Sequence, residues 1–195
     1  HIVSISENKE IEKRVAITPE LAKKYIDLGL NLSISNGYGN HLGFKDADYQ
    51  KFGVNLLDDE KKIITDADII IQLGLLDNEK LSYLKENQTL VGSLNSFDNK
   101  DRLDVLKGKK INLFSLDLLP RITRAQSMDI LSSQANLAGY KAVVEAFQVY
   151  EKAIPMMMTA AGTIPAAKVL VVGAGVAGLQ AIATAKRMGA VVFAT

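Results

Sequence analysis

The stretch KVLVVGAGVAGLQAIATAKRMG, residues 168–189, decides the fold of the part of the chain in which it lies. It opens with a short apolar run, passes through glycines spaced as G-x-G-x-x-G, and continues as a helical pattern that ends at Gly189. Such glycines let the backbone approach a pyrophosphate closely, and a helix N-terminus favours its negative charge. We therefore predict a dinucleotide-binding turn that uses Gly173, Ala174, Gly175, Val176 and Gly178. The alternative is a turn with only a structural role.

The residues after this turn are expected to form a second strand, at 190–195. Two strands and one helix are too few for a complete dinucleotide-binding domain, so we expect 151–195 to be the beginning of a truncated one. The acidic residue that would contact the ribose hydroxyls is expected about 20 residues after the turn, and would follow Thr195. The turn alone does not distinguish NAD from NADP.

The preceding part of the chain alternates short apolar runs with amphipathic segments, which is typical of right-handed βαβ units with a buried parallel sheet. The predicted strands are 2–6, 31–35, 54–57, 68–73, 89–94 and 111–116, and the predicted helices between them are 18–28, 46–52, 58–65, 78–85 and 100–106. The first of these helices has Thr18 as N-cap, Pro19 at its first position and Gly29 after its end. We predict an α/β fold: a Rossmann- or flavodoxin-like three-layer αβα domain at 1–126, a linking helix at 127–150, and the start of a Rossmann domain.

Composition excludes several classes of protein. Hydrophobic residues make up 48% of the chain, enough for a real core, and 23 Lys plus Arg balance 22 Asp plus Glu without a basic stripe. Nucleic acid is therefore not expected as a partner. No apolar run reaches the roughly 18 residues of a membrane span, so direct membrane insertion is not expected. The absence of cysteine excludes disulfides and thiolate chemistry.

Residues 120–140, PRITRAQSMDILSSQANLAGY, form a polar loop that leads into a long helix, and we expect them to act as a hinge beside a ligand cleft. Ser127 or Asp129 is the expected N-cap. Arg121, Arg124, Gln126 and Asp129 lie within nine residues, so a cation, an amide and a carboxylate could converge on a planar polar group such as a carboxamide. From their chemistry alone, a solvated loop with weak Arg–Asp pairs is an equal alternative. We predict that the buried stripe of the helix contains Leu137, Tyr140, Val144 and Phe147.

Other polar or sulfur-containing residues give weaker signals. Arg14 is expected at the surface or facing the same cleft, and His41 in a loop. Met156, Met157 and Met158 are expected to fill core space. No spacing of His, Asp or Glu suggests a metal site.

Three segments closely resemble the NAD(H)-binding component (domain I, alpha subunit) of proton-translocating NAD(P) transhydrogenase, within the alanine dehydrogenase/transhydrogenase N-terminal superfamily. They are RVAITPE at 14–20, PRITRAQSMDILSSQANLAGYKAVVEA at 120–146, and MMMTAAGTIPAAKVLVVGAGVAGLQAIATAKRMGAVV at 156–192. The RITRAQSMD loop is the most specific of them.

This resemblance implies direct hydride transfer from NADH to NADP⁺ held on a partner component, coupled to proton translocation by a membrane-spanning component. It also implies a homodimer, peripheral to the inner membrane on its cytoplasmic or matrix face. Arg121 would hold the nicotinamide carboxamide and Gln126 would bridge toward the NADP(H) ring. Asp129 and Ser132 would fix the loop, and Gly173, Gly175 and Gly178 would receive the pyrophosphate.

Two alternatives remain open. Alanine dehydrogenase, an NAD-dependent enzyme, resembles this chain in fold and uses an Arg, a Lys and a His for its substrate. Only the Arg is matched, by Arg14, because Gln72 and Asn95 stand where the Lys and His would fall. Oxidative deamination needs a group that titrates near neutral pH, whereas hydride transfer between nicotinamides needs mainly orientation. The other alternative is a non-catalytic truncated module that binds nucleotide weakly, because the second unit would end on an unpaired apolar edge.

Overall fold

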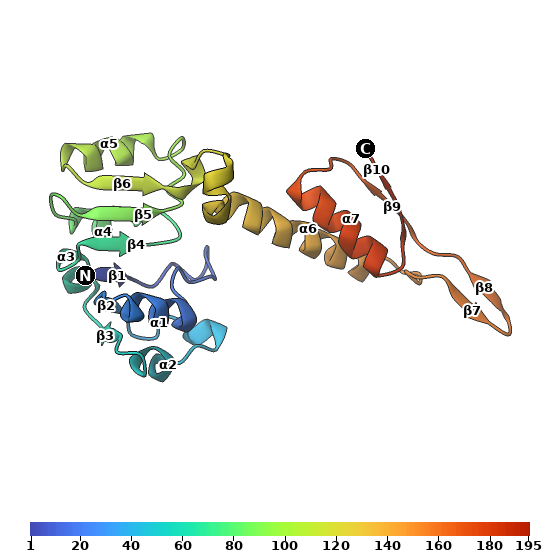
Figure 1. Ribbon diagram of the computed structural model, residues 1–195, viewed down its shortest axis with the longest axis horizontal. Coiled ribbons are helices and arrows are strands. Elements are labelled where there is room, and N and C mark those ends of the chain that lie inside the picture. Colours follow the sequence, from blue (N-terminus) through green and yellow to red (C-terminus); the bar gives the residue numbers. More distant parts are fainter. The chain divides into compact units, whose positions relative to one another are not determined.

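A computed structural model describes all residues, 1–195, and the chain divides into two compact units, His1–Pro120 and Arg121–Thr195. The first unit is built on a six-stranded parallel sheet of order β3-β2-β1-β4-β5-β6 (Figure 1). All six predicted strands are confirmed. They are β1 (Ile2–Ser4), β2 (Leu32–Ser35), β3 (Asn55–Leu57), β4 (Ile69–Ile71), β5 (Thr89–Gly92) and β6 (Asn112–Ser115).

The five predicted helices of this unit are also confirmed, with shorter bounds at several ends. They are α1 (Pro19–Asp27), α2 (Asp46–Gln50), α3 (Glu60–Thr65), α4 (Asn78–Ser82) and α5 (Lys100–Gly108). The caps of α1, α3 and α4 are side chains of the residue types that favour helix N-termini. The Thr18 hydroxyl accepts a hydrogen bond from the Leu21 amide at 3.3 Å, and Gly29 adopts φ +80° after the end of α1. Asp59 and Asp77 cap α3 and α4 in the same way.

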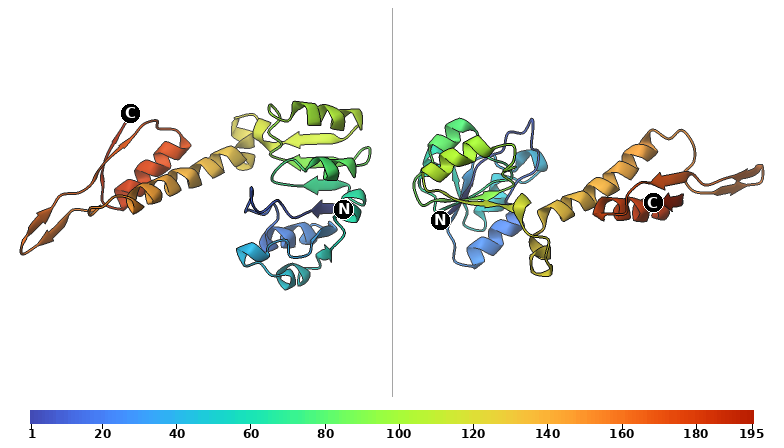
Figure 2. Two further views of the ribbon diagram at one scale, coloured as in Figure 1. Left: turned by 180° about the vertical axis from the view of Figure 1, so that it is seen from behind. Right: turned by 90° about the horizontal axis from the view of Figure 1, so that it is seen from above.

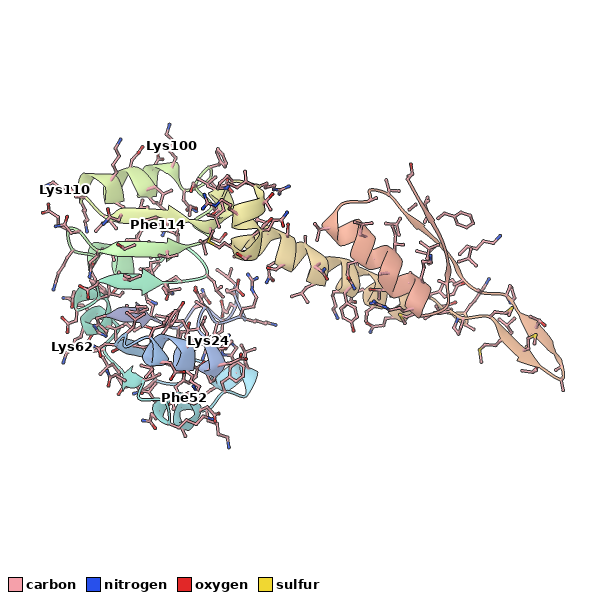
Figure 3. All side chains as sticks on the ribbon, viewed as in Figure 1. Lys24, Phe52, Lys62, Lys100, Lys110 and Phe114 are labelled. Atoms are coloured by element: carbon pink, nitrogen blue, oxygen red, sulfur yellow. The ribbon has the colours of Figure 1, made fainter.

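The core of this unit is divided by the sheet into two clusters of buried apolar residues, because neighbouring residues of a strand face opposite sides. Val3 and Ile70 belong to one cluster, together with residues of α3, α4 and α5. Ile2 belongs to the other, with residues of α1 and α2. The result is the predicted three-layer αβα sandwich (Figure 2). Lysines on its outer helices and turns project away from the sheet, and Phe114 is 59% exposed on the edge strand β6 (Figure 3).

The second unit begins with a 3₁₀ helix, η3 (Thr123–Met128), and the long helix α6 (Ile130–Gln148). A β-hairpin of β7 (Met157–Thr159) and β8 (Gly162–Ile164) follows, paired in antiparallel register. The predicted strand, helix and strand are then observed as β9 (Lys168–Val171), α7 (Val176–Arg187) and β10 (Val191–Ala194), with β9 and β10 parallel. No helix of the chain has both the length and the apolar character needed to cross a membrane.

Two predictions for this unit are wrong. Met156, Met157 and Met158 do not fill a core: they lie at the hairpin with exposures of 60%, 47% and 75%. The hairpin strands have no second layer over them, so apolar character there did not imply burial.

The predicted stripe of α6 is wrong for two of its four residues, because Leu137 and Tyr140 are 59% and 50% exposed, whereas Val144 and Phe147 are partly buried. The residues of α6 that are fully buried are Gly139 and Val143. A hydrophobic pattern finds large side chains, whereas α6 packs against α7 through small ones.

Candidate functional site

The glycine-rich turn between β9 and α7 has the geometry for which its residue types are suited. Gly173 adopts φ +96°, a conformation that side chains with a Cβ rarely tolerate. A Cβ on Gly178 would lie 1.8 Å from the Gly173 carbonyl oxygen, so only glycine fits there. A Cβ on Gly175 would meet nothing within 4 Å. The first and third glycines are therefore required by the backbone, and the second leaves open space over it.

The same turn starts a helix whose N-terminal amides are available to an anion. Gly175 occupies the N-cap of α7 and provides no side-chain acceptor, and the first turn contains no acidic residue. The basic residues of the helix, Lys186 and Arg187, lie in its last turn. Uncapped amides and the helix dipole together favour a phosphate at this end.

The polar loop before α6 divides into a fixed part and a free part. Asp129 is the N-cap of α6: its Oδ1 accepts from the Ser132 amide at 2.9 Å and its Oδ2 from the Ser132 hydroxyl at 2.7 Å. These hydrogen bonds lower the pKa of Asp129, with a smaller contribution from the charge of Arg121. Of the two expected caps, Asp129 is correct, and Ser127 lies within η3.

The remaining predicted residues of the loop have no partner within the protein. The side chains of Arg121, Arg124 and Gln126 are exposed and make no hydrogen bond or ion pair. The Arg–Asp pairs of the solvated-loop alternative are therefore not formed, and the structure brings together only Asp129 and Ser132. Two cations and an amide are left with their hydrogen-bonding groups turned to solvent.

A second polar feature lies wholly in the first unit, where a cavity of about 950 Å³ opens at the carboxyl ends of β1, β4 and β5. The strand order reverses between β1 and β4, and ligands of open α/β sheets bind at such a reversal. Its lining includes Ser6 and Glu7 after β1, Gln72 and Leu73 after β4, and Ser93 after β5.

Most charged groups of this cavity are neutralised by one another. Arg14 donates from Nε to Glu12 at 2.8 Å and from Nη2 at 2.6 Å, and this bonding lowers the pKa of Glu12. Lys80 forms an ion pair with Glu60 at 3.0 Å. Glu7 has no cation within ion-pair distance; its Oε1 accepts from the Leu73 amide at 2.6 Å, and burial raises its pKa.

Gln72 and Asn95, predicted to replace titratable residues, have different environments. Gln72 is 3% exposed, and its amide makes all four hydrogen bonds of which it is capable. Its oxygen accepts from the Ser4 hydroxyl and the Ile5 amide, and its nitrogen donates to the Ile5 carbonyl and to Glu7. Asn95 is exposed at φ +46° and donates to Asp98 at 2.6 Å. Gln72 thus joins the ends of β1 and β4 through buried hydrogen bonds.

Sequence reasoning missed two tyrosines that hold the segment carrying Arg14. The Tyr38 hydroxyl accepts from the amides of Ala16 and Ile17 and hydrogen-bonds Ser4 at 2.7 Å. Tyr49 donates to the Ile17 carbonyl at 3.0 Å. Burial raises the pKa of both phenols. The signal was a pair of aromatic residues with hydroxyls between apolar runs, but nothing in it identified the partner loop.

His41 lies in the loop as expected. It belongs to the 3₁₀ turn η1 (Asn40–Leu42), and its Nε2 lies 2.7 Å from the Lys13 carbonyl oxygen. It therefore helps to hold the same segment before α1.

Comparison with known proteins identifies the family. The sequence profile described as the alanine dehydrogenase/PNT N-terminal domain matches residues 4–138, and that of the corresponding C-terminal domain matches residues 142–195. The chain belongs to the alanine dehydrogenase/PNT family. Within this family, the chain is 45% identical over 195 residues to an NAD(P) transhydrogenase subunit alpha protein of Rickettsia prowazekii, covering 98% of this chain and 51% of that one. It thus spans about half the length of that relative.

Two further comparisons separate the branches of the family. A crystal structure of transhydrogenase from Sinorhizobium meliloti superimposes with a TM-score of 0.91 at 44% identity, over 100% of this chain and 58% of the other. An alanine dehydrogenase of Halomonas elongata is 28% identical over 188 residues, which is 94% of this chain and half of that protein. Similarity to the transhydrogenases is therefore the greater. The α/β, Rossmann-like fold predicted from the sequence is confirmed.

Proposed function

We propose that this chain is part of the NAD(H)-binding component of a proton-translocating NAD(P) transhydrogenase. The observation that carries the proposal is the glycine-rich turn, which combines a required positive φ, a required close approach and open space over an uncapped helix N-terminus. These features fit the pyrophosphate of a dinucleotide. The 45% identity to a transhydrogenase subunit supports NAD(H) as that dinucleotide.

The residues of the polar loop would orient the nicotinamide end. When bound, NADH supplies the hydride, and the protein has to hold the donor and acceptor rings in the reacting geometry. Arg121 and Gln126 suit this task because their side chains have no internal partner that a ligand must displace. Arg121 would hold the carboxamide, and Gln126 would reach toward NADP(H) on the partner component. Asp129 and Ser132 would keep the loop in place through their mutual hydrogen bonds.

Hydride transfer requires no acid–base group at the reacting carbons. The absence of a titratable side chain at position 72, which lines the cavity of the first unit, is consistent with such a reaction. Gln72 does not titrate, and its amide is fully used within the protein. The observation that favours the alternative, an alanine dehydrogenase-like enzyme, is Glu7, a partly buried carboxyl with no cation within ion-pair distance, whose pKa is raised by burial. The functional test therefore has to include alanine.

The test of the proposal is hydride exchange between nicotinamide analogues with the full-length protein and its NADP(H)-binding partner. Gln126→Ala should slow exchange by about 100-fold, because it removes a group that orients the reacting atoms, with a much smaller change in NADH affinity. The matched control is Gln134→Ala, an exposed glutamine on α6, which is expected to leave exchange unchanged. Exchange that is insensitive to Gln126→Ala, or ammonia released from L-alanine, would contradict the proposal.

A direct titration separates this proposal from the alternative of a non-catalytic module. The 195-residue chain is titrated with NADH, and the signal is the change in NADH fluorescence. Micromolar binding would exclude a weakly binding truncated fragment. Absence of binding by the full-length protein would exclude the transhydrogenase assignment.

The proposal extends to the assembly. We expect the protein to work as a homodimer, bound through its NADP(H)-binding and membrane-spanning components to the cytoplasmic or matrix face of the inner membrane. The exposed methionines of the β7–β8 hairpin support a protein contact, because adaptable apolar side chains are common at such interfaces. Met158→Asp is expected to shift the sedimentation coefficient toward that of a monomer. An unchanged coefficient would remove the hairpin from the interface.

A further inference from the structure

At Gly139 the backbone of α6 packs directly against the glycine-rich turn. A Cβ on Gly139 would lie 2.0 Å from the carbonyl oxygen of Ala177, 2.8 Å from its carbonyl carbon and 3.0 Å from its Cα. Ala177 is within the G-x-G-x-x-G sequence. No flexible side chain is involved, so an added methyl group can be accommodated only if one helix moves relative to the other.

This approach determines how α6 and α7 pack. The two helices lie side by side in both views (Figures 1 and 2), and the buried residues of α6 are Gly139 and, one turn later, Val143. The larger side chains of α6 nearby, Leu137 and Tyr140, are at least half exposed. The distance between the helices is therefore set at a position without a side chain.

The same helix carries the polar loop at its other end. Asp129 caps the N-terminus of α6, and the ten residues from there to Gly139 correspond to about 15 Å of helix. A helix of this kind is a rigid spacer, so the contact of Gly139 with Ala177 fixes how far Asp129, at the end of the polar loop, lies from the turn. Loop and turn both belong to the second unit.

We infer that Gly139 is a positioning residue that sets the spacing between the pyrophosphate-binding turn and the nicotinamide-binding loop. The inference rests on the proposed function, because that function requires one dinucleotide to reach both places. It predicts that a small displacement of α6 weakens the binding of a ligand that spans the two sites more than the binding of a ligand that occupies the turn alone. A purely structural role would impair both ligands to the same extent.

The experiment compares NADH with ADP-ribose, which has the pyrophosphate but lacks the nicotinamide ring, using the full-length protein. Gly139→Ala is expected to weaken NADH binding by about tenfold or more and to slow hydride exchange by about 100-fold, as an ångström-scale misplacement does. ADP-ribose binding is expected to change by less than about threefold, since the turn itself keeps its glycines. The matched control is Gly108→Ala at the end of α5, where a Cβ would meet nothing within 4 Å, and both ligands should bind as to the wild type.

The outcomes distinguish the inference from the proposed function. If the wild-type protein binds neither ligand, the proposed function is wrong. If the wild type binds both and Gly139→Ala leaves the ratio of the two affinities unchanged, the inference is overturned. If Gly139→Ala fails to fold, Val143→Ile is used in its place, because it adds a single methylene one turn along α6. The ratio of the NADH and ADP-ribose affinities is expected to change in the same direction, by a smaller factor. An unchanged ratio in that variant would overturn the inference equally.

Discussion

The ends of β1 and β9 are two parallel-strand ends that differ in how they deal with polar groups. After β1 the chain reads SENKEIEKR, and the cavity there is lined by side chains that bond to one another. After β9 it reads GAGVAG, with few side chains and helix amides that no side chain caps. After β1 the polar side chains form hydrogen bonds with one another. After β9 the backbone amides at the start of α7 remain available to bind an anion.

The comparison teaches that polarity alone does not identify a binding site. The first unit has more charged groups, but Arg14 is held by Glu12, Lys80 by Glu60, and the amide of Gln72 has no free position. A ligand would have to compete with these internal bonds, each of which is net favourable. At the glycine-rich turn there is no such competitor.

The largest expected effect is at the turn, where Gly178→Ala should reduce NADH affinity by more than about 100-fold. The new Cβ would lie 1.8 Å from the Gly173 carbonyl oxygen, so the turn has to open and its amides lose their common direction. Fluorescence titration with NADH measures the loss.

A control at the same turn separates steric damage from ligand contact. Gly175→Ala introduces a Cβ that meets no protein atom within 4 Å. We expect its free energy of unfolding to stay within about 0.5 kcal/mol of the wild type, while NADH affinity falls about tenfold because the methyl group occupies the ligand's approach. Full affinity in Gly175→Ala would place the dinucleotide elsewhere.

The second prediction concerns Gln72, which links the ends of β1 and β4 in the first unit. Gln72→Ala removes three buried hydrogen bonds and one partly buried one, and it takes away the partner of the Ile5 amide and carbonyl, whereas the Ser4 hydroxyl keeps its bond to Tyr38. We therefore expect a loss of about 3 kcal/mol in the free energy of unfolding. Chemical denaturation measures it, with the exposed Gln50→Ala as control. NADH affinity should not change. A loss of less than about 1 kcal/mol in the free energy of unfolding would mean that water replaces the amide. The polar groups of the cavity would then depend less on internal hydrogen bonds than the structure indicates.

The sequence was informative where local chemistry determines local structure. Thr18, Pro19 and Gly29 delimit α1, and the glycines of 173–178 define their own turn, because caps and positive-φ positions depend on neighbouring residues. The partners of Gln72 and Tyr38 could not be read from the sequence, since they lie 68 and 34 residues away, at Ser4. Gly139 was missed for a related reason: a pattern search weights large apolar side chains, and the closest helix contact is made by a residue with none.

The third prediction tests the charge of the first cavity through pH. Burial raises the pKa of Glu7 in the folded state above its ordinary 4.5, so the folded protein binds a proton more tightly than the unfolded chain. Stability contributed by this group is therefore present at low pH and is lost as pH rises from the ordinary value through the raised one. Glu7→Gln can still accept the Leu73 amide, and its free energy of unfolding should fall less over that window. A pH dependence equal to that of the wild type would mean that Glu7 is hydrated.

The smallest effect is expected for Arg14→Ala, at the residue that the sequence resemblance aligns with an arginine expected to bind substrate in alanine dehydrogenases. Its pair with Glu12 is partly exposed, with Arg14 at 52%, so the loss should be at most about 0.5 kcal/mol at pH 7. Because Arg14 lowers the pKa of Glu12, this contribution exists above the ordinary value of 4.5 and disappears as pH falls through the lowered one. Urea denaturation at neutral pH and at a pH below the lowered pKa measures it.

The loss of unfolding free energy in Arg14→Ala tests the contrast between the internally bonded side chains after β1 and the open backbone amides after β9. If Arg14→Ala loses well over about 1 kcal/mol, the pair with Glu12 is part of the folded framework of the cavity, and a carboxylate ligand could not readily displace Glu12 from it. A small loss leaves Arg14 exchangeable. In that case the contrast is one of degree, and it depends on Gln72, Glu7 and the Lys80–Glu60 pair.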